Sequence, residues 1–221
     1  MKKWITLGQA LTPDGQTISL LEHDGSYSIR VGAAELMSTR QHASEERMAE
    51  LACAHVREAR APRVLIGGLG FGFTLRAALS CVGPGAQVTV AELLEAVIAW
   101  NADAALPLAA SAMADPRVTV LHRDVAEVIA ESRAAFDSIL LDVDNGPDAL
   151  TAAGNGRLYD AAGLHRVRAA LRPGGCVVFW SVAPDAAFAQ RMARAGFAVE
   201  VQHARARPNG GGWHTLFLGR L

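Results

Sequence analysis

Residues 63–72, "RVLIGGLGFG", decide the fold predicted for this chain. Residues 64–66 form a short unbroken apolar run, which is typical of a strand buried on both faces of a parallel sheet. Four glycines follow at once: Gly67, Gly68, Gly70 and Gly72. A helical pattern begins after them, and a turn without Cβ atoms lets a nucleotide-like ligand approach the backbone N–H groups at its start. We therefore expect a nucleotide-type ligand here; the alternative is a tight turn that binds nothing.

The glycine spacing separates two ligand classes. Dinucleotide-binding folds favour G-x-G-x-x-G, whereas this chain reads Gly68-x-Gly70-x-Gly72 and has Phe73 where the third glycine would fall. The observed spacing resembles motif I of the class I S-adenosylmethionine-dependent methyltransferases. An NAD-dependent oxidoreductase is the alternative that Phe73 disfavours.

Composition limits the possible partners and compartments. The chain has 221 residues, 51% of them hydrophobic, and a net charge of −1, so nothing favours nucleic acid or an acidic membrane surface as a partner. We find neither the apolar core of a signal peptide nor an apolar run of about 18 residues. Three cysteines far apart in sequence, Cys53, Cys81 and Cys176, indicate buried thiols rather than a disulfide framework or a zinc site. These features predict a cytoplasmic protein.

The first 42 residues are predicted to be a β-rich arm. Three strand candidates, "WITLGQA", "TISLLEH" and "YSIRV", are divided by turn signals at residues 13–15 and 24–26. This is too little chain for a core of its own, so the arm should pack on the main domain or pair with a second subunit. A homodimer is therefore expected. Residues 43–60 then show helical spacing that stops at Pro62.

Residues 43–221 are predicted to form one α/β domain. Strand-like stretches alternate with helical ones, which implies a doubly wound, mostly parallel sheet with right-handed crossovers. Two further strands at the end add an antiparallel hairpin and complete a seven-stranded sheet. The expected strands are residues 63–67, 87–92, 117–122, 136–143, 176–181, 197–206 and 213–221.

Acidic residues end three of the predicted parallel strands, where ligands of such sheets bind. Glu92 lies about 20 residues after the glycine turn, a spacing expected for a carboxylate that binds ribose hydroxyls. Asp124 is suited either to the exocyclic amine of adenine or to capping the next helix, or to both. Asp142 follows four apolar residues, where an uncompensated charge is costly, and Asp144 comes two residues later.

The acidic group after the fourth parallel strand suggests two kinds of chemistry. It could receive a cationic substrate and take a proton from an amine nucleophile. Mg²⁺ binding is the alternative, but no histidine or further acid close in sequence supports it, so no metal is expected.

Over nearly its full length the chain resembles the spermidine synthase-like branch of the class I methyltransferase fold. The matching stretches are "VLIGGLGFG", "VTVAEL", "RVTVLHRD", "FDSILLDVDNGP" and "LYDAAGLHRVRAALRPGGCVVFWS". The resemblance implies that Glu92 binds the ribose, that Asp124 lies near adenine, and that Asp142 is the catalytic acid/base. It also implies S-adenosyl-L-methionine, or its decarboxylated form, as the cofactor.

Three departures from the polyamine synthases concern the donor tail and the acceptor. Gly70 stands where those enzymes carry an Asp for the donor's amino group, Trp180 replaces a Gln that fixes the diamine, and residues 44–47 read Ser-Glu-Glu-Arg in place of a Tyr-His-Glu motif. The adenosine-binding positions are kept. This pattern favours S-adenosylmethionine itself as the donor, since an Asp at position 70 would repel its carboxylate.

Further candidates surround the expected acceptor. Trp180 could line the acceptor site and offer a cation–π face, or it could be an ordinary core residue. His42 and Glu45 could cover the site or simply begin a solvated helix, and the polar tip of His214 could reach only solvent.

The leading hypothesis is an S-adenosylmethionine-dependent transferase that moves a methyl group to a small amine. Asp142 would orient and deprotonate the acceptor and Asp144 would add negative potential. The alternatives are an aminopropyltransferase of the spermidine synthase type, and a catalytically silent S-adenosylmethionine-binding protein.

Overall fold

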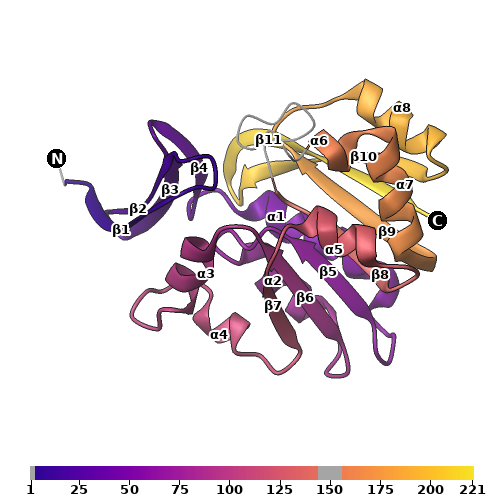
Figure 1. Ribbon diagram of the computed structural model, residues 1–221, viewed down its shortest axis with the longest axis horizontal. Coiled ribbons are helices and arrows are strands. Elements are labelled where there is room, and N and C mark those ends of the chain that lie inside the picture. Colours follow the sequence, from indigo (N-terminus) through magenta and orange to yellow (C-terminus); the bar gives the residue numbers. More distant parts are fainter. Residues whose placement is uncertain (1–2, 144–155) are drawn as a thin grey trace.

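The computed structural model describes residues 3–143 and 156–221, and within them a seven-stranded sheet forms the centre of the molecule (Figure 1). Its strand order is β10-β11-β9-β8-β5-β6-β7. The strands are β5 (Arg63–Gly67), β6 (Gln87–Glu92), β7 (Val118–His122), β8 (Phe136–Leu141), β9 (Leu171–Ser181), β10 (Ala198–Arg207) and β11 (Gly210–Arg220). Strands β5 to β9 pair in parallel, whereas β11 is antiparallel to both β9 and β10. The predicted doubly wound sheet with an antiparallel hairpin is confirmed.

Helices cover both faces of this sheet. The first face carries α1 (Ala43–Cys53), the 3₁₀ turn η1 (Ala54–Val56), α2 (Phe73–Cys81), α3 (Glu95–Ala102) and α4 (Ala110–Met113). The second face carries α5 (Val125–Glu131), α6 (Gly156–Tyr159), α7 (Ala161–Ala170) and α8 (Ala186–Arg194). No helix among the described residues is long and apolar enough to cross a membrane.

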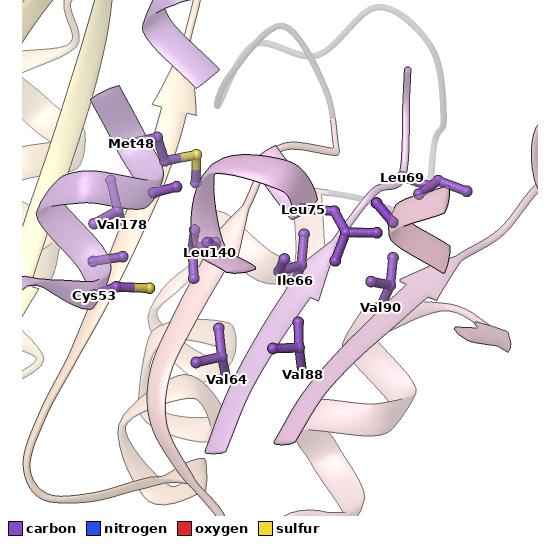
Figure 2. Packing of buried hydrophobic residues seen from close by; sticks show 14 of the residues in the cluster. Met48, Cys53, Val64, Ile66, Leu69, Leu75, Val88, Val90, Leu140 and Val178 are labelled. Atoms are coloured by element: carbon purple, nitrogen blue, oxygen red, sulfur yellow. The ribbon is translucent and has the colours of Figure 1, made fainter. Parts of the chain in front are cut away.

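Strand β5 shows why its apolar run is continuous. Val64 and Ile66 pack with Leu75 of α2 and Val88 of β6 on the first face (Figure 2), while Leu65 belongs to the core of the second face. Successive residues of a strand point to opposite faces, so a strand covered on both sides must be apolar at every position. This burial fixes the end of β5, and with it the place of the glycine loop.

The strand order reverses beside β5, because β6 and β7 lie on one side of it and β8 and β9 on the other. Ligands of doubly wound sheets bind at such a switch point, outside the carboxyl ends of the strands. Gly67 at the end of β5 pairs with Leu141 at the end of β8, and Asp142 N–H donates to Gly67 O over 3.0 Å. The glycine loop and Asp142 are therefore neighbours.

The N-terminal residues form a separate antiparallel sheet, which Figure 1 shows beside the main one. Its strands are β1 (Ile5–Leu11), β2 (Thr17–His23), β3 (Ser26–Val31) and β4 (Ala34–Ser38), paired in chain order. Three of them match the predicted strands. Strand β4 was not predicted; it follows a turn at Gly32, whose φ of 56° favours glycine.

Several boundaries differ from the prediction. The helix expected over residues 43–60 ends at Cys53 and continues only as the 3₁₀ turn η1. Strand β8 ends at Leu141, so Asp142 and Val143 lie beyond the sheet rather than in it. Helix α7 begins at Ala161, where the Asp160 side chain accepts a hydrogen bond from Gly163 N–H and caps it.

Candidate active site

The loop after β5 takes a conformation that favours glycine. Gly68 and Gly70 have φ angles of 88° and 53°, a region that side chains with a Cβ rarely adopt. A Cβ at Gly68 would collide with the carbonyl oxygen of Asp142, whereas one at Gly70 would lie 3.2 Å from Sδ of Met37 in β4. Gly67 and Gly72 are crowded by protein atoms as well. The loop is therefore packed closely against β8 and lies beneath β4.

Glu92 holds this loop in place. Its Oε2 accepts a hydrogen bond from Leu69 N–H over 2.8 Å, and its Oε1 accepts one from Leu94 N–H over 2.9 Å. Glu92 is only 8% exposed. Burial raises the pKa of its carboxyl, and the backbone N–H groups oppose that shift. Each carboxylate oxygen has a further lone pair for a ligand, so the side chain can join the loop to a bound hydroxyl.

Asn101 of α3 supports the same loop and was not predicted from the sequence. Its Nδ2 donates to the carbonyl oxygens of Gly70 and Val97, each over 2.8 Å, and the residue is fully buried. A lone asparagine in a helical pattern carries no signal for this contact, because its partner lies 31 residues away.

Asp124 caps α5. Its Oδ1 accepts a hydrogen bond from Ala126 N–H over 2.7 Å, and its Oδ2 forms an ion pair with Arg157 of α6. Of the two roles considered for this residue, helix capping is observed. Contact between Asp124 and adenine stays a prediction. The residue lines a cavity, so this contact is compatible with its capping role.

The first cavity, which we name the glycine-loop cavity, has a volume of about 280 Å³ and lies between the loop, the end of β6 and the N-terminal sheet. Its polar side chains include Glu92, Asp124 and Asp142, and its apolar walls include Leu93 and Val125. The cavity therefore combines apolar walls with three carboxyl groups.

A second cavity of about 320 Å³, the Trp180 cavity, adjoins it. Its polar wall residues include Glu35, Glu45 and His214 as well as Trp180. Both cavities are also lined by Leu36, Met37, Gly70, Asp142 and Val143. The two spaces therefore meet at the loop, with Asp142 on their common boundary.

Asp142 and Glu45 are two carboxyls with displaced pKa values. Burial raises the pKa of Asp142 to about 6, and the Thr74 hydroxyl, which donates to its Oδ2 over 3.2 Å, opposes that shift. Burial also raises the pKa of Glu45 well above its ordinary value, with a further contribution from the charge of Asp142 and an opposing one from Arg76. The charge of one carboxyl therefore opposes ionisation of the other. Asp144 lies outside the described residues.

His42 lies beside the site but on neither cavity wall. Its ring stacks on Phe73 with centroids 4.5 Å apart, and its Nδ1 lies 2.9 Å from Oε1 of Glu46. His42, which precedes α1, therefore packs against Phe73 of α2, and of the two predicted residues only Glu45 lines either cavity.

Trp180 is joined to Ser44, which was not predicted as a site residue, and through it to His214, whose polar tip was considered to reach only solvent. Its Nε1–H donates to Ser44 Oγ over 3.0 Å, and Ser44 Oγ lies 2.8 Å from Nδ1 of His214. The three residues come from β9, α1 and β11, so no local pattern could have connected them.

No group of three or more histidine, cysteine, aspartate or glutamate side chains that could hold a metal ion occurs in the described ranges 3–143 and 156–221.

Comparison with solved structures adds to this geometry. Neither a family model nor a curated protein sequence matches the chain. A spermidine synthase from Thermotoga maritima superposes with a TM-score of 0.76 at 17% identity, over 97% of this chain and 72% of that one. A spermidine synthase in complex with the transition-state analogue AdoDATO superposes with a TM-score of 0.75 at 17% identity, over the same shares.

The chain has the fold of the spermidine synthases. It shares the broader class I methyltransferase fold with a Burkholderia thailandensis 1,6-didemethyltoxoflavin-N1-methyltransferase, whose structure contains 1,6-didemethyltoxoflavin and S-adenosylhomocysteine. That TM-score is 0.57 at 18% identity, over 96% of this chain and 98% of the methyltransferase. The resemblance seen in the sequence is confirmed as a resemblance of fold.

Proposed function

We propose that this chain is an S-adenosylmethionine-dependent transferase that moves a methyl group to a small, amine-containing acceptor. One observation carries the proposal: Asp142 lies on the boundary shared by the glycine-loop cavity and the Trp180 cavity. A carboxyl in this position faces one space suited to a nucleoside and another suited to a cation.

The glycine-loop cavity fits the adenosine half of the donor. Glu92 offers acceptor oxygens for ribose hydroxyls, and Leu93 and Val125 offer apolar surface for the faces of adenine. Asp124 would accept from the adenine amine. The solved neighbours contain AdoDATO and S-adenosylhomocysteine, which is consistent with a ligand of this kind here.

The Trp180 cavity fits an amine. Three of its wall residues, Glu35, Glu45 and Asp142, are acids, and none of the described residues that line it is a lysine or arginine. S-adenosylmethionine supplies a methyl group already activated by the adjacent sulfonium. The chain has then to bind the amine, orient it and accept its proton. Burial raises the pKa of Asp142 to about 6, which brings its basicity closer to that of a general base working near neutral pH.

Methyl transfer is favoured over aminopropyl transfer by Gly70. No side chain projects from this position, and Met37 Sδ lies 3.2 Å from where a Cβ would be. The carboxylate of an intact S-adenosylmethionine tail would therefore meet no acidic side chain at position 70 itself. Aminopropyl transfer from decarboxylated S-adenosylmethionine is the second candidate, supported by the fold and by the acidic Trp180 cavity.

Incubation of the protein with each donor and a panel of amines, followed by mass spectrometry, tests the proposal. We expect methylated amines with S-adenosylmethionine and their loss in Asp142→Asn. Aminopropylated products as the main outcome would establish the second candidate instead. Binding of S-adenosylmethionine by calorimetry without any product would indicate a catalytically silent binding protein.

A further inference from the structure

A partly buried hydrogen-bond chain includes two residues that line the Trp180 cavity. It runs from Trp180 Nε1–H to Ser44 Oγ over 3.0 Å and from Ser44 Oγ to His214 Nδ1 over 2.8 Å. The rings of Trp180 and His214 also meet edge to face, with centroids 4.5 Å apart. Both rings line the cavity, whereas Ser44 is 1% exposed and lies behind them.

The chemistry of the three groups fixes the direction of this chain. An indole N–H can only donate, so Ser44 Oγ accepts from Trp180. Among the described residues, the partner left for the buried Ser44 hydroxyl proton is Nδ1 of His214. Leaving that proton unpaired would cost about 1–3 kcal/mol. His214 Nδ1 therefore accepts, and a neutral imidazole that accepts at Nδ1 carries its proton on Nε2.

The neutral form of His214 is favoured by its surroundings, since burial lowers the pKa of this imidazole. The ring is thus held as a neutral group with one fixed donor, Nε2–H. Gln41 also lines the cavity, but its amide can turn to donate or accept. Trp180 has already given its only N–H to Ser44.

The cavity therefore offers two different kinds of recognition. Asp142, Glu45 and Glu35 provide carboxyl oxygens for an amine, while His214 provides an N–H for a hydrogen-bond acceptor. A diamine protonated on both nitrogens has no acceptor to offer His214. An amine that also carries a carbonyl oxygen would satisfy both.

We propose that His214 determines acceptor specificity by donating Nε2–H to a carbonyl oxygen, so that the preferred acceptors are small amino amides rather than diamines. This rests on the proposed function, because it takes the Trp180 cavity as the acceptor site. Ser44 and Trp180 act as positioning residues that hold the histidine in one tautomer. No bond is made or broken in this step beyond the hydrogen bond itself.

The first test needs no turnover. Nitrogen-15 NMR of the histidine side chains of the full chain should show His214 protonated on Nε2 and unprotonated on Nδ1. In Ser44→Ala that preference should be lost. Addition of 4-aminobutanamide should shift the His214 Nε2 signal, whereas 1,4-diaminobutane should leave it within error. A proton on Nδ1 in the unmodified chain, or equal shifts with both probes, would overturn the proposal.

The second test separates specificity from fold. His214→Phe should raise KM for 4-aminobutanamide about tenfold, the order expected for one lost hydrogen bond, and change KM for 1,4-diaminobutane by less than about twofold. His214→Gln, whose amide can still donate, should recover part of the difference. Equal changes for both substrates would contradict the specificity role. If the unmodified chain transfers nothing to either amine, the proposed function fails, and the NMR shifts alone decide the role of His214.

Discussion

Glu92 at the end of β6 accepts a hydrogen bond from the backbone N–H of Leu69, 23 residues earlier in the chain, over 2.8 Å. The acid expected to bind a ribose is thus also the residue that anchors the glycine loop. A ligand hydroxyl on Glu92 would therefore be placed relative to the loop by a single side chain. Because of this double role, substitution of Glu92 should affect both the conformation of the loop and the binding of the donor.

Glu92→Gln should weaken both the loop and donor binding. The amide keeps one acceptor oxygen but turns an NH₂ group toward a backbone N–H that had a partner. The free energy of unfolding should fall by about 1–3 kcal/mol, and S-adenosylmethionine affinity should fall about tenfold to a hundredfold. Urea unfolding and calorimetry measure the two. Glu95→Gln, an exposed neighbour on α3, should change neither; unaltered affinity in Glu92→Gln would remove Glu92 from the donor site.

Asp142→Asn should abolish most of the activity. Loss of a general base costs about a hundredfold to ten-thousandfold in rate, and the side chain keeps its size, so donor affinity should change little. In the unmodified protein kcat/KM should fall as pH drops through about 6, since the pKa of Asp142 is raised to about 6. Initial-rate assays at a series of pH values measure this dependence of kcat/KM on pH. Full activity of Asp142→Asn at neutral pH would rule out Asp142 as the general base.

The same substitution should stabilise the protein at high pH. The pKa of Asp142 is about 6 when folded, against about 3.9 for an ordinary aspartate, so the folded chain binds more protons between these values. Stability is then lost as pH rises from about 4 through 6. Asp142→Asn should be about 1–3 kcal/mol more stable than the unmodified protein at pH 8, and equal to it below pH about 4. Denaturant unfolding at both pH values decides; a less stable variant at pH 8 would contradict the burial argument.

Thr74→Val should move the pH dependence of the reaction. The Thr74 hydroxyl donates to Asp142 Oδ2 over 3.2 Å and lowers the pKa of Asp142. Without it, that pKa rises, and the acid side of the kcat/KM profile should shift to higher pH. Thr74→Ser keeps a hydroxyl and should retain the original profile. The same shift in both variants would mean that packing, and not the hydrogen bond, sets the profile.

A homodimer remains a prediction, and the N-terminal sheet indicates where to test it. Strand β1 lies at the edge of that sheet, and its side chains Ile5, Leu7 and Leu11 are 52%, 42% and 71% exposed. An exposed apolar edge strand is prone to pairing with another chain. Ile5→Lys with Leu7→Lys should give a monomer in sedimentation experiments. Val201→Lys, at an exposed valine of β10, should not; a monomeric unmodified protein would exclude the dimer.

The parts of the site that follow strand ends could be predicted from sequence. An apolar run sets the end of a buried strand, so the positions of Gly67, Glu92 and Asp142 followed from local patterns. The parallel arrangement then brought these ends to one edge of the sheet. Asp124 could not be assigned in advance, because helix capping and ligand contact call for the same carboxylate.

The contacts that join distant elements could not be predicted in this way. Ser44 and His214 are 170 residues apart and meet only because α1 packs across β9 and β11. Strand β4 was missed because its five residues, Ala34–Ser38, have no alternation of apolar and polar residues. Its Met37 nonetheless lines both cavities.

The position of Met37 has a consequence for the order of events. The flexible thioether side chain of Met37 lies beside the glycine loop and belongs to the walls of both cavities. Its conformation therefore affects the width of both. An outward movement of this side chain would widen both at once. Whichever molecule arrives first would then set the entrance that the second one finds.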